Sequence, residues 1–167
     1  RYKIDCTGLK YGLHRKQYFY SKKGIKIIPE PGDFVVDGGA FLGDSSIIFS
    51  NLVGSNGKIY CFEILEQNIK ILRSNICNFP FDNCVIFDTG LSDKNYDPKV
   101  NVKPTGFDSS FKTNSNCKTS SLDYLVEKGE IEKVDFIKLD IEGEELKALI
   151  GAKNTINKFM PKMSLSI

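Results

Sequence analysis

The chain has 167 residues, of which 41% are hydrophobic, and its 23 basic and 21 acidic residues give a formal net charge of +2. This length supports one sizeable hydrophobic core and argues against two ordinary domains. The near-balanced charge argues against a nucleic-acid or membrane partner, so we expect a small-molecule partner and leave the oligomeric state open.

Two further features of the composition concern the compartment. The five cysteines are scattered without a C-x-x-C pair, which is typical of reduced, structural thiols. No apolar stretch reaches the ~18 residues that a transmembrane helix requires, and no charged-then-apolar signal segment opens the chain. We therefore expect a soluble, cytoplasmic protein. The chain opens at Arg1 and stops within an apolar run, so we also expect it to be truncated at the C-terminus.

Residues 1–30 carry weak patterns and are expected to form an N-terminal extension, in which residues 18–20 and 25–28 pair as a hairpin that covers one edge. From Asp33 onward, short β-branched runs alternate with longer amphipathic segments. This alternation is typical of βαβ units and predicts one α/β domain with a mainly parallel sheet over residues 31–167.

The first half of this domain is predicted to contain three strands and two helices. The strands are expected at residues 34–36, 58–62 and 84–87, with one helix beginning near Asp44 and another over 66–76. Helical spacing of apolar residues predicts the buried face of each helix: Ile47, Ile48 and Leu52 in the first, and Ile69, Leu72 and Ile76 in the second.

The second half begins with an unusual segment. Residues 94–120 are rich in Asn, Lys, Ser, Thr and Pro and are predicted to form a long loop or lid. A short helix, a strand, a long helix and a last strand are then expected at residues 121–128, 134–139, 144–158 and 163–167.

The turn after the first predicted strand lies within VVDGGAFLGDSS at residues 35–46 and contains Gly38, Gly39 and Gly43. Glycine lets the backbone approach a ligand closely, and the helix that follows offers unpaired N–H groups to a negative group. The carboxylate of Asp37 would repel a pyrophosphate but suits the ammonium of an amino-acid moiety. The turn therefore points to S-adenosylmethionine rather than NAD, although a purely structural tight turn gives the same pattern.

A second acid, Glu63, ends the second predicted strand. In a doubly wound sheet a carboxylate at this position takes both ribose hydroxyls of a nucleoside. An acid at a strand end is also often a solvated residue or a helix cap. The joint occurrence of Asp37 and Glu63 at two consecutive strand ends favours the nucleoside site.

The third and fourth predicted strands also end in polar turns. In FDTGLSD, Asp88 or the backbone of residues 89–91 is expected to meet the adenine ring, with a helix-capping turn as the alternative. In KLDIEGEE, strand geometry puts Lys138, Asp140 and Glu142 on one side, and Asp140 and Glu142 are assigned to the cleft. Glu144 and Glu145 lie where a helix would start, and carboxylates there suit its dipole.

Four strings carry a resemblance to a known family. VVDGGAFLGD, CFEILEQN at 61–68, SLDYL at 121–125 and FIKLDIEGEELKALIGA at 136–152 resemble the FkbM-type methyltransferases. The resemblance implies a class I Rossmann-like fold that binds S-adenosylmethionine, with strand order 3-2-1-4-5 and without the further C-terminal strands that such domains usually have. It also implies O-methylation of a hydroxyl, often on a sugar or hydroxylated natural product.

The resemblance and the turns around its motifs define the predicted site. The family pattern assigns cofactor binding to the positions of Asp37, Gly39, Gly43 and Glu63, and places Asp140 and Glu142 beside the transferable methyl group. The full predicted cofactor-binding set is Asp37, Gly38, Gly39, Ala40, Phe41, Gly43, Asp44, Ser45, Glu63, Ile64, Asn68, Asp88, Thr89, Gly90 and Asp140.

The catalytic hypothesis concerns how a neutral hydroxyl loses its proton. Asp140 or Glu142 is expected to act as the base, or as a ligand of a metal that acidifies the acceptor; no metal ligands are assigned. His14, the single histidine, is a weaker proton-shuttle candidate. Two other classes stay open: a non-catalytic S-adenosylmethionine- or nucleotide-binding module, and an NAD-dependent oxidoreductase.

Overall fold

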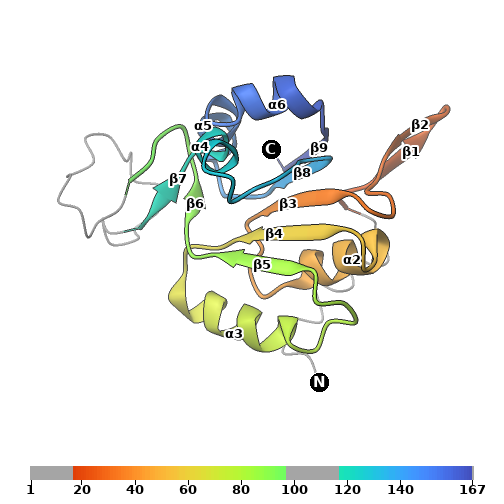
Figure 1. Cartoon of the computed structure of the whole chain (residues 1–167), viewed down its shortest axis with the longest axis horizontal. Coiled ribbons are helices and arrows are strands. Elements are labelled where there is room, and N and C mark those ends of the chain that lie inside the picture. Colours follow the sequence, from red (N-terminus) through yellow and green to blue (C-terminus); the bar gives the residue numbers. More distant parts are fainter. Residues whose placement is uncertain (1–16, 97–116, 167) are drawn as a thin grey trace.

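A parallel sheet of five strands forms the centre of the protein. The computed structural model describes residues 17–96 and 117–166. All five strands run parallel in the order β5-β4-β3-β8-β9, which confirms the predicted order 3-2-1-4-5. Their bounds are β3 Phe34–Gly38, β4 Lys58–Phe62, β5 Cys84–Phe87, β8 Phe136–Leu139 and β9 Lys162–Leu165. Figure 1 shows the strands in this order, with α3 beyond β5 and α6 beyond β9.

Helices cover both faces of the sheet. One buried cluster joins the sheet to α2 (Asp44–Val53) and α3 (Glu66–Ile76) through Phe49, Val53 and Leu72. The other joins it to α4 (Leu122–Glu127), α5 (Glu145–Ile150) and α6 (Lys153–Phe159). Neighbouring residues of β3 point to opposite faces, so Val35 belongs to the first cluster and Val36 to the second. The sheet is therefore buried on both sides, as parallel sheets usually are.

The predicted buried face of α2 is wrong. The helix turns Ser45, Ser46, Phe49, Ser50 and Val53 inward, whereas Ile47, Ile48 and Leu52 are only half-buried. The serines can be buried because their hydroxyls have partners: Ser50 donates to Asn83 at 2.8 Å, and the other two donate to Asp37.

The single long helix predicted over 144–158 is also wrong, since α5 ends at Ile150 and α6 begins at Lys153. Gly151 lies so close to the backbone that a Cβ there would stand 2.0 Å from the carbonyl oxygen of Ser92. The carboxylate of Asp123 then caps the new helix by accepting from the amides of Asn154 and Thr155 at 2.9 and 2.7 Å. Asp123, from the SLDYL string, thus ties α4 to α6.

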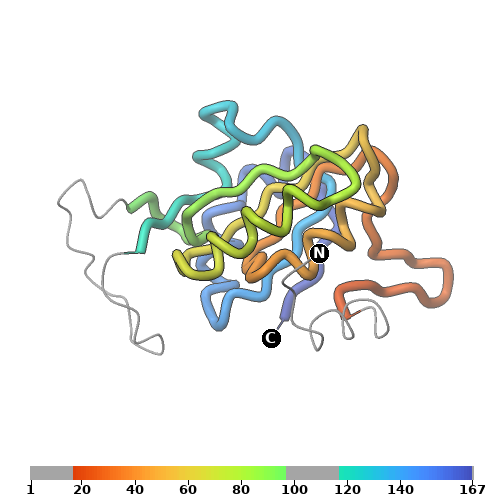
Figure 2. Tube along the Cα trace, turned by 90° about the horizontal axis from the view of Figure 1, so that it is seen from below, coloured from red at the N-terminus to blue at the C-terminus, as the bar shows by residue number. Residues whose placement is uncertain are grey.

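The predicted N-terminal hairpin is confirmed as strands β1 (Tyr20–Lys22) and β2 (Ile25–Ile27). It forms a separate two-stranded sheet with mostly exposed residues, and it extends away from the rest of the described chain (Figure 2). Strand β2 nevertheless contacts β9, the strand at one edge of the main sheet, so the hairpin lies at a sheet edge as expected. Just after the hairpin, Lys162 of β9 donates to the Ile28 carbonyl at 3.3 Å.

A short parallel pair, β6 (Gly90–Leu91) and β7 (Thr119–Ser120), flanks the segment predicted as a loop or lid. Tyr96 and Thr119 exchange two backbone hydrogen bonds of 2.8 Å. Residues 97–116 of that predicted loop lie outside the described residues, as do Cys6 and His14.

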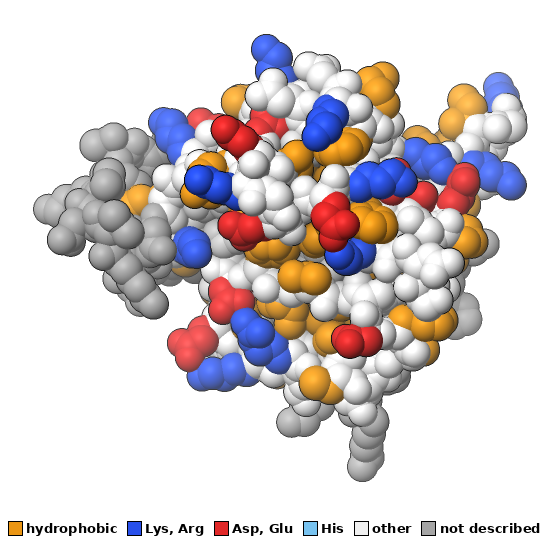
Figure 3. Space-filling model, in the orientation of Figure 1, with side chains coloured by type: hydrophobic (Ala, Val, Ile, Leu, Met, Phe, Trp, Pro, Cys, Tyr) orange, Lys and Arg blue, Asp and Glu red, His pale blue; other side chains and the backbone are white. Residues whose placement is uncertain are grey.

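The surface carries both charge signs. Figure 3 shows acidic and basic side chains interspersed over the visible face, in keeping with the near-zero net charge. None of the helices described is long and apolar enough to cross a membrane. Within the same residues, Cys61, Cys77, Cys84 and Cys117 are free thiols.

Candidate functional site

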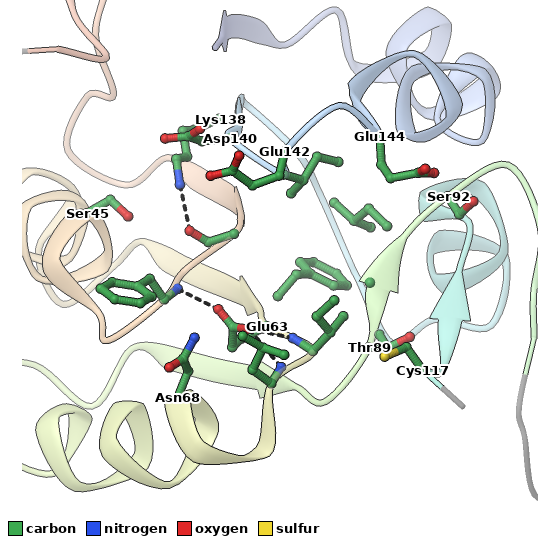
Figure 4. A pocket seen from close by; sticks show the side chains of 18 of the residues that line it. Ser45, Glu63, Asn68, Thr89, Ser92, Cys117, Lys138, Asp140, Glu142 and Glu144 are labelled. Carbon is green, nitrogen blue, oxygen red and sulfur yellow. Dashed lines mark hydrogen bonds between the residues drawn. The ribbon is translucent and has the colours of Figure 1, made fainter. Parts of the chain in front are cut away.

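A pocket of about 470 Å³ opens at the carboxyl ends of the central strands. Its wall comes from the turns after β3, β4, β5 and β8, with further residues from β6, β7 and the segment before β1. Figure 4 shows the labelled side chains converging on it from these elements. Ligand sites in open α/β sheets lie at this edge, and the volume suits a nucleoside-sized ligand.

Most of the predicted site residues meet in this pocket. Both predicted catalytic residues, Asp140 and Glu142, line it. Of the predicted cofactor-binding residues, the wall also includes Gly39, Phe41, Asp44, Ser45, Glu63, Ile64, Asn68, Thr89 and Gly90. The structure does not place Asp37, Gly38, Ala40, Gly43 or Asp88 in the wall.

Glu63 is held by backbone amides from two turns. Its Oε1 accepts from the N–H groups of Ile64 and Leu65, both at 2.8 Å, and its Oε2 accepts from Phe41 at 3.0 Å. The side chain is 7% exposed. An ionised carboxylate has about four acceptor positions, so these three bonds fix its orientation and leave one position on Oε2. Glu63 therefore presents an oriented acceptor to the pocket.

The glycines after β3 serve the protein's own packing. Gly39 has a φ of 76°, and a Cβ there would lie 2.0 Å from the carbonyl oxygen of Asp140. Gly43 has a φ of 94° and would meet the side chain of Leu72 at 2.9 Å. The turns after β3 and β8 can approach each other only because residue 39 has no side chain.

Asp37 lies behind the pocket wall. It is fully buried, and its Oδ2 accepts from the hydroxyls of Ser45 and Ser46 at 2.7 and 2.6 Å. Its Oδ1 pairs with the ammonium of Lys138 at 3.0 Å. The place that the sequence assigned to a ligand ammonium is thus taken by a lysine of the chain.

Lys138 connects β8 to the glycine turn. Besides the ion pair, its ammonium donates to the carbonyl oxygens of Gly38 and Gly39 at 3.1 and 2.8 Å. The residue is 1% exposed and still touches the pocket. The positive charge of Lys138 can be buried because Asp37 and two carbonyl dipoles compensate it. These three contacts hold the glycine turn in its shape.

Asp44 is the pocket acid at the start of α2. Burial raises the pKa of its carboxyl group, and repulsion from Asp37 adds to this rise. The amides of Asp44 and Ser45 oppose the rise by bonding to the carboxylate. A cationic group of a ligand would relieve this unfavourable burial of negative charge.

The turn after β8 supplies the remaining acids. Asp140 Oδ2 accepts from the phenol of Tyr18 at 2.7 Å. Glu142 adopts a φ of 57°, a left-handed conformation uncommon for a residue with a Cβ. Glu145 accepts from the amide of Ile141 at 2.9 Å, as expected at a helix start, while Glu144 both precedes α5 and lines the pocket.

Beyond β5, two neighbouring residues behave differently. Asp88 points outward and forms an exposed ion pair with Arg73 at 2.7 Å. Thr89 is 4% exposed, lines the pocket, and its Oγ1 has no hydrogen-bond partner among the described residues. An unsatisfied buried hydroxyl in a pocket wall is a site at which a polar ligand atom would gain a hydrogen bond.

The charges decide what the pocket can bind. Its described wall contains five acids and Lys138, whose charge is already paired: Asp44, Glu63, Asp140, Glu142 and Glu144. A pocket with this excess of negative charge favours a cationic ligand. Over the described residues, no group of three or more His, Cys, Asp or Glu side chains is arranged to hold a metal ion.

Several wall residues were missed from the sequence. Lys138 offered a clue, because a lysine inside the apolar run FIKL needs a buried partner. Tyr18 and Cys117 offered none, since they lie far along the chain from the motifs. Ser92 and Ile141 belong to turns that were already assigned to the site, whereas Glu144 was expected only to start a helix.

Comparisons with known proteins agree with this geometry. The methyltransferase FkbM domain family matches residues 37–167. Hexuronic acid methyltransferase AglP of Haloferax volcanii is 28% identical over 131 residues, which cover 76% of this chain and 53% of the relative. The chain thus spans about half the length of this curated relative.

Solved structures show the same fold. The methyltransferase FkbM from Methylobacillus flagellatus superposes with a TM-score of 0.66 at 21% identity, covering 90% of this chain and 36% of that one. A SAM dependent methyltransferase from Aquifex aeolicus gives a TM-score of 0.51 at 18% identity, covering 98% of this chain and 72% of that one. These likenesses confirm the predicted class I methyltransferase fold. With the family match over most of its length, the chain belongs to the FkbM methyltransferase domain family.

Proposed function

We propose that this protein is an S-adenosylmethionine-dependent methyltransferase that methylates a hydroxyl oxygen of a carbohydrate or another hydroxylated small molecule. The observation that carries the proposal is the acid-lined pocket in which backbone amides orient Glu63. Its excess of negative charge suits a sulfonium nucleoside and disfavours the pyrophosphate of NAD.

The wall residues fit the parts of the cofactor. Glu63, with a free acceptor position on Oε2, is suited to a ribose hydroxyl. Ile64 and the unpartnered hydroxyl of Thr89 are suited to the adenine ring. Asp44 is suited to the cationic end of the molecule, because a positive group would offset the buried carboxylate. Asp37 contributes from behind the wall, by holding Lys138 against the glycine turn.

S-Adenosylmethionine supplies a methyl group that is already activated by a positively charged sulfur. The chain's own task is to orient the acceptor and to remove its proton. Asp140 and Glu142 both face the pocket and are the carboxylates assigned to this proton. A positioned base contributes roughly 10²–10⁴-fold to such a step.

The class of acceptor is supported by a relative. The protein of Haloferax volcanii is named a hexuronic acid methyltransferase, which supports a carbohydrate acceptor for this chain. The polar wall near Ser92 and Thr119 is compatible with a hydroxylated acceptor.

Cofactor binding is the first experiment. At about 100 times its Kd a ligand stabilises the folded protein by ~2.7 kcal/mol, which raises Tm by ~2–4 °C per kcal/mol in a domain of this size. We expect this rise with S-adenosylmethionine and with adenosylhomocysteine, and none with NAD. A rise with NAD alone would contradict the proposal.

Turnover separates an enzyme from a silent binding module. Release of adenosylhomocysteine is measured over a panel of sugars, with each sugar omitted in turn as the control. We expect acceptor-dependent release that falls at least tenfold in Asp140→Asn or Glu142→Gln. If both variants keep full turnover, the base assignment is wrong.

A further inference from the structure

Tyr18 enters the pocket from outside the part of the chain that matches the family, which starts at residue 37. The segment that carries it is anchored to the core. Phe19 makes an edge-on contact with Phe49 of α2, with ring centroids 6.1 Å apart, and both Tyr18 and Phe19 pack against the cluster between α2 and the sheet. Tyr18 is therefore held in place rather than resting on the surface.

The ring of Tyr18 bridges the two turns that meet at Gly39. Its hydroxyl donates to Asp140 Oδ2 at 2.7 Å, and its ring centroid lies 5.0 Å from the ammonium of Lys138. Burial and the neighbouring Asp140 both raise the pKa of this phenol. The hydroxyl thus stays protonated at any working pH and always acts as the donor.

A permanent donor fixes the orientation of a carboxylate. The bond from Tyr18 holds the rotation of Asp140, so that Oδ2 is occupied and Oδ1 is left for the pocket. A base needs this fixed orientation before it receives a proton.

We propose that Tyr18 is a positioning residue of this site, which orients the carboxylate of Asp140 for proton removal from the acceptor. The inference rests on the proposed function, since it assumes that Asp140 is the base. The hydrogen bond and the ring contact with Lys138 make Tyr18 part of the site although it precedes the family domain.

Several other titratable groups share this end of the pocket with Asp140. The titratable groups that face this end of the pocket are Tyr18, Asp37, Asp44, Lys138 and Glu142. Tyr18→Phe removes the hydrogen bond to Asp140 and leaves the formal charges of the acids and of Lys138 unchanged.

The test compares Tyr18→Phe with Tyr20→Phe. Both remove one hydroxyl, but Tyr20 is 44% exposed on β1 and outside the pocket. Turnover is followed with the sugar that gives the most adenosylhomocysteine in the panel, and S-adenosylmethionine binding is followed by calorimetry. Phenylalanine keeps the ring over Lys138, so we expect the Tm of both variants to stay close to that of the parent.

We expect Tyr18→Phe to lower kcat about tenfold, because Asp140 is then no longer held in the orientation that proton removal needs, with little change in KM for S-adenosylmethionine. Tyr20→Phe should leave both measurements unchanged.

A double-mutant cycle decides whether Tyr18 acts through Asp140. Tyr18→Phe should have no further effect on kcat in the Asp140→Asn background. Equal behaviour of the two tyrosine variants, or a full Tyr18→Phe effect in that background, would overturn the inference alone. A parent protein that binds no S-adenosylmethionine would instead overturn the proposed function.

Discussion

Asp37 and Glu63 look equivalent in the sequence, since each is an acid at the end of a parallel strand, yet the structure gives them different surroundings. Asp37 is the fourth residue of β3 and shares its face with Val35, under α2. Glu63 follows the last residue of β4, where the chain leaves the sheet. A side chain within a strand belongs to a face of the sheet, whereas one just past the end belongs to the edge where ligands bind.

This difference assigns the two carboxylates different tasks. Asp37 forms an ion pair with Lys138 and accepts hydrogen bonds from two serines of α2. It thereby keeps the glycine turn in shape. Glu63 is oriented by three amides and faces the pocket. Variants that separate stability from cofactor binding should therefore tell the two residues apart.

The largest effect is expected for the buried ion pair. Lys138→Met leaves Asp37 buried without its counter-charge, so the free energy of unfolding should fall by about 3–5 kcal/mol in urea titrations. Lys162→Met is the matched control, because its ion pair with Glu30 is 34% and 64% exposed and should contribute far less to stability than the buried pair. Equal losses would show that the Lys138–Asp37 pair does not hold the turn.

The next effect concerns the contact between the two turns. Gly39→Ala combines a left-handed backbone with a clash at the Asp140 carbonyl and should cost about 2–4 kcal/mol. Gly32→Ala has a similar φ of 88° but no atom within 4 Å of the added Cβ, so only the backbone cost of about 1–2 kcal/mol is expected. If thermal unfolding gives the same loss of stability for both variants, the close approach of Gly39 to the Asp140 carbonyl does not add to the cost.

A smaller effect, on binding, distinguishes the two acids directly. Glu63→Gln should weaken S-adenosylmethionine binding by about 1.5–3 kcal/mol, because a charge-assisted hydrogen bond to the ribose is lost. Asp37→Asn should lower Tm while leaving most of the affinity, since Asp37 does not line the pocket. Calorimetric titration of both variants measures this, and a larger affinity loss in Asp37→Asn would reverse the assignment.

The smallest effect is expected at the third acid, Asp44, and depends on pH. Its carboxyl pKa is raised in the folded protein, so the stability it contributes is present below the unfolded pKa of about 3.9 and is lost as pH rises through the folded pKa. Asp44→Asn should therefore stabilise the protein at pH 7, by less than about 1 kcal/mol because the helix dipole already favours the acid. Urea titrations at pH 7 and pH 3 should show the gain at pH 7 only; a gain at both would point to another cause.

Local patterns were enough to predict the elements that depend on local spacing. The bounds of β4, α3 and β5 agree with the prediction because apolar runs and helical spacing define them. The break between α5 and α6 could not be predicted this way. It depends on Gly151 meeting Ser92, which is distant along the chain.

The candidate site shows the same limit. Glu63 was predictable because a strand end can be recognised from the sequence. The burial of Asp37 depends on which face of β3 it occupies and on serines of α2, and the outward turn of Asp88 depends on Arg73 of α3. Tyr18 reaches Asp140 across most of the chain, and no spacing rule connects them.

The paired strands β6 and β7 have a consequence for engineering. With the Tyr96–Thr119 bridge they fasten both ends of the intervening stretch beside Cys117 and Thr119 of the pocket wall. These paired ends are therefore defined junctions at which residues 97–116 can be exchanged while the described part of the pocket wall keeps its anchors.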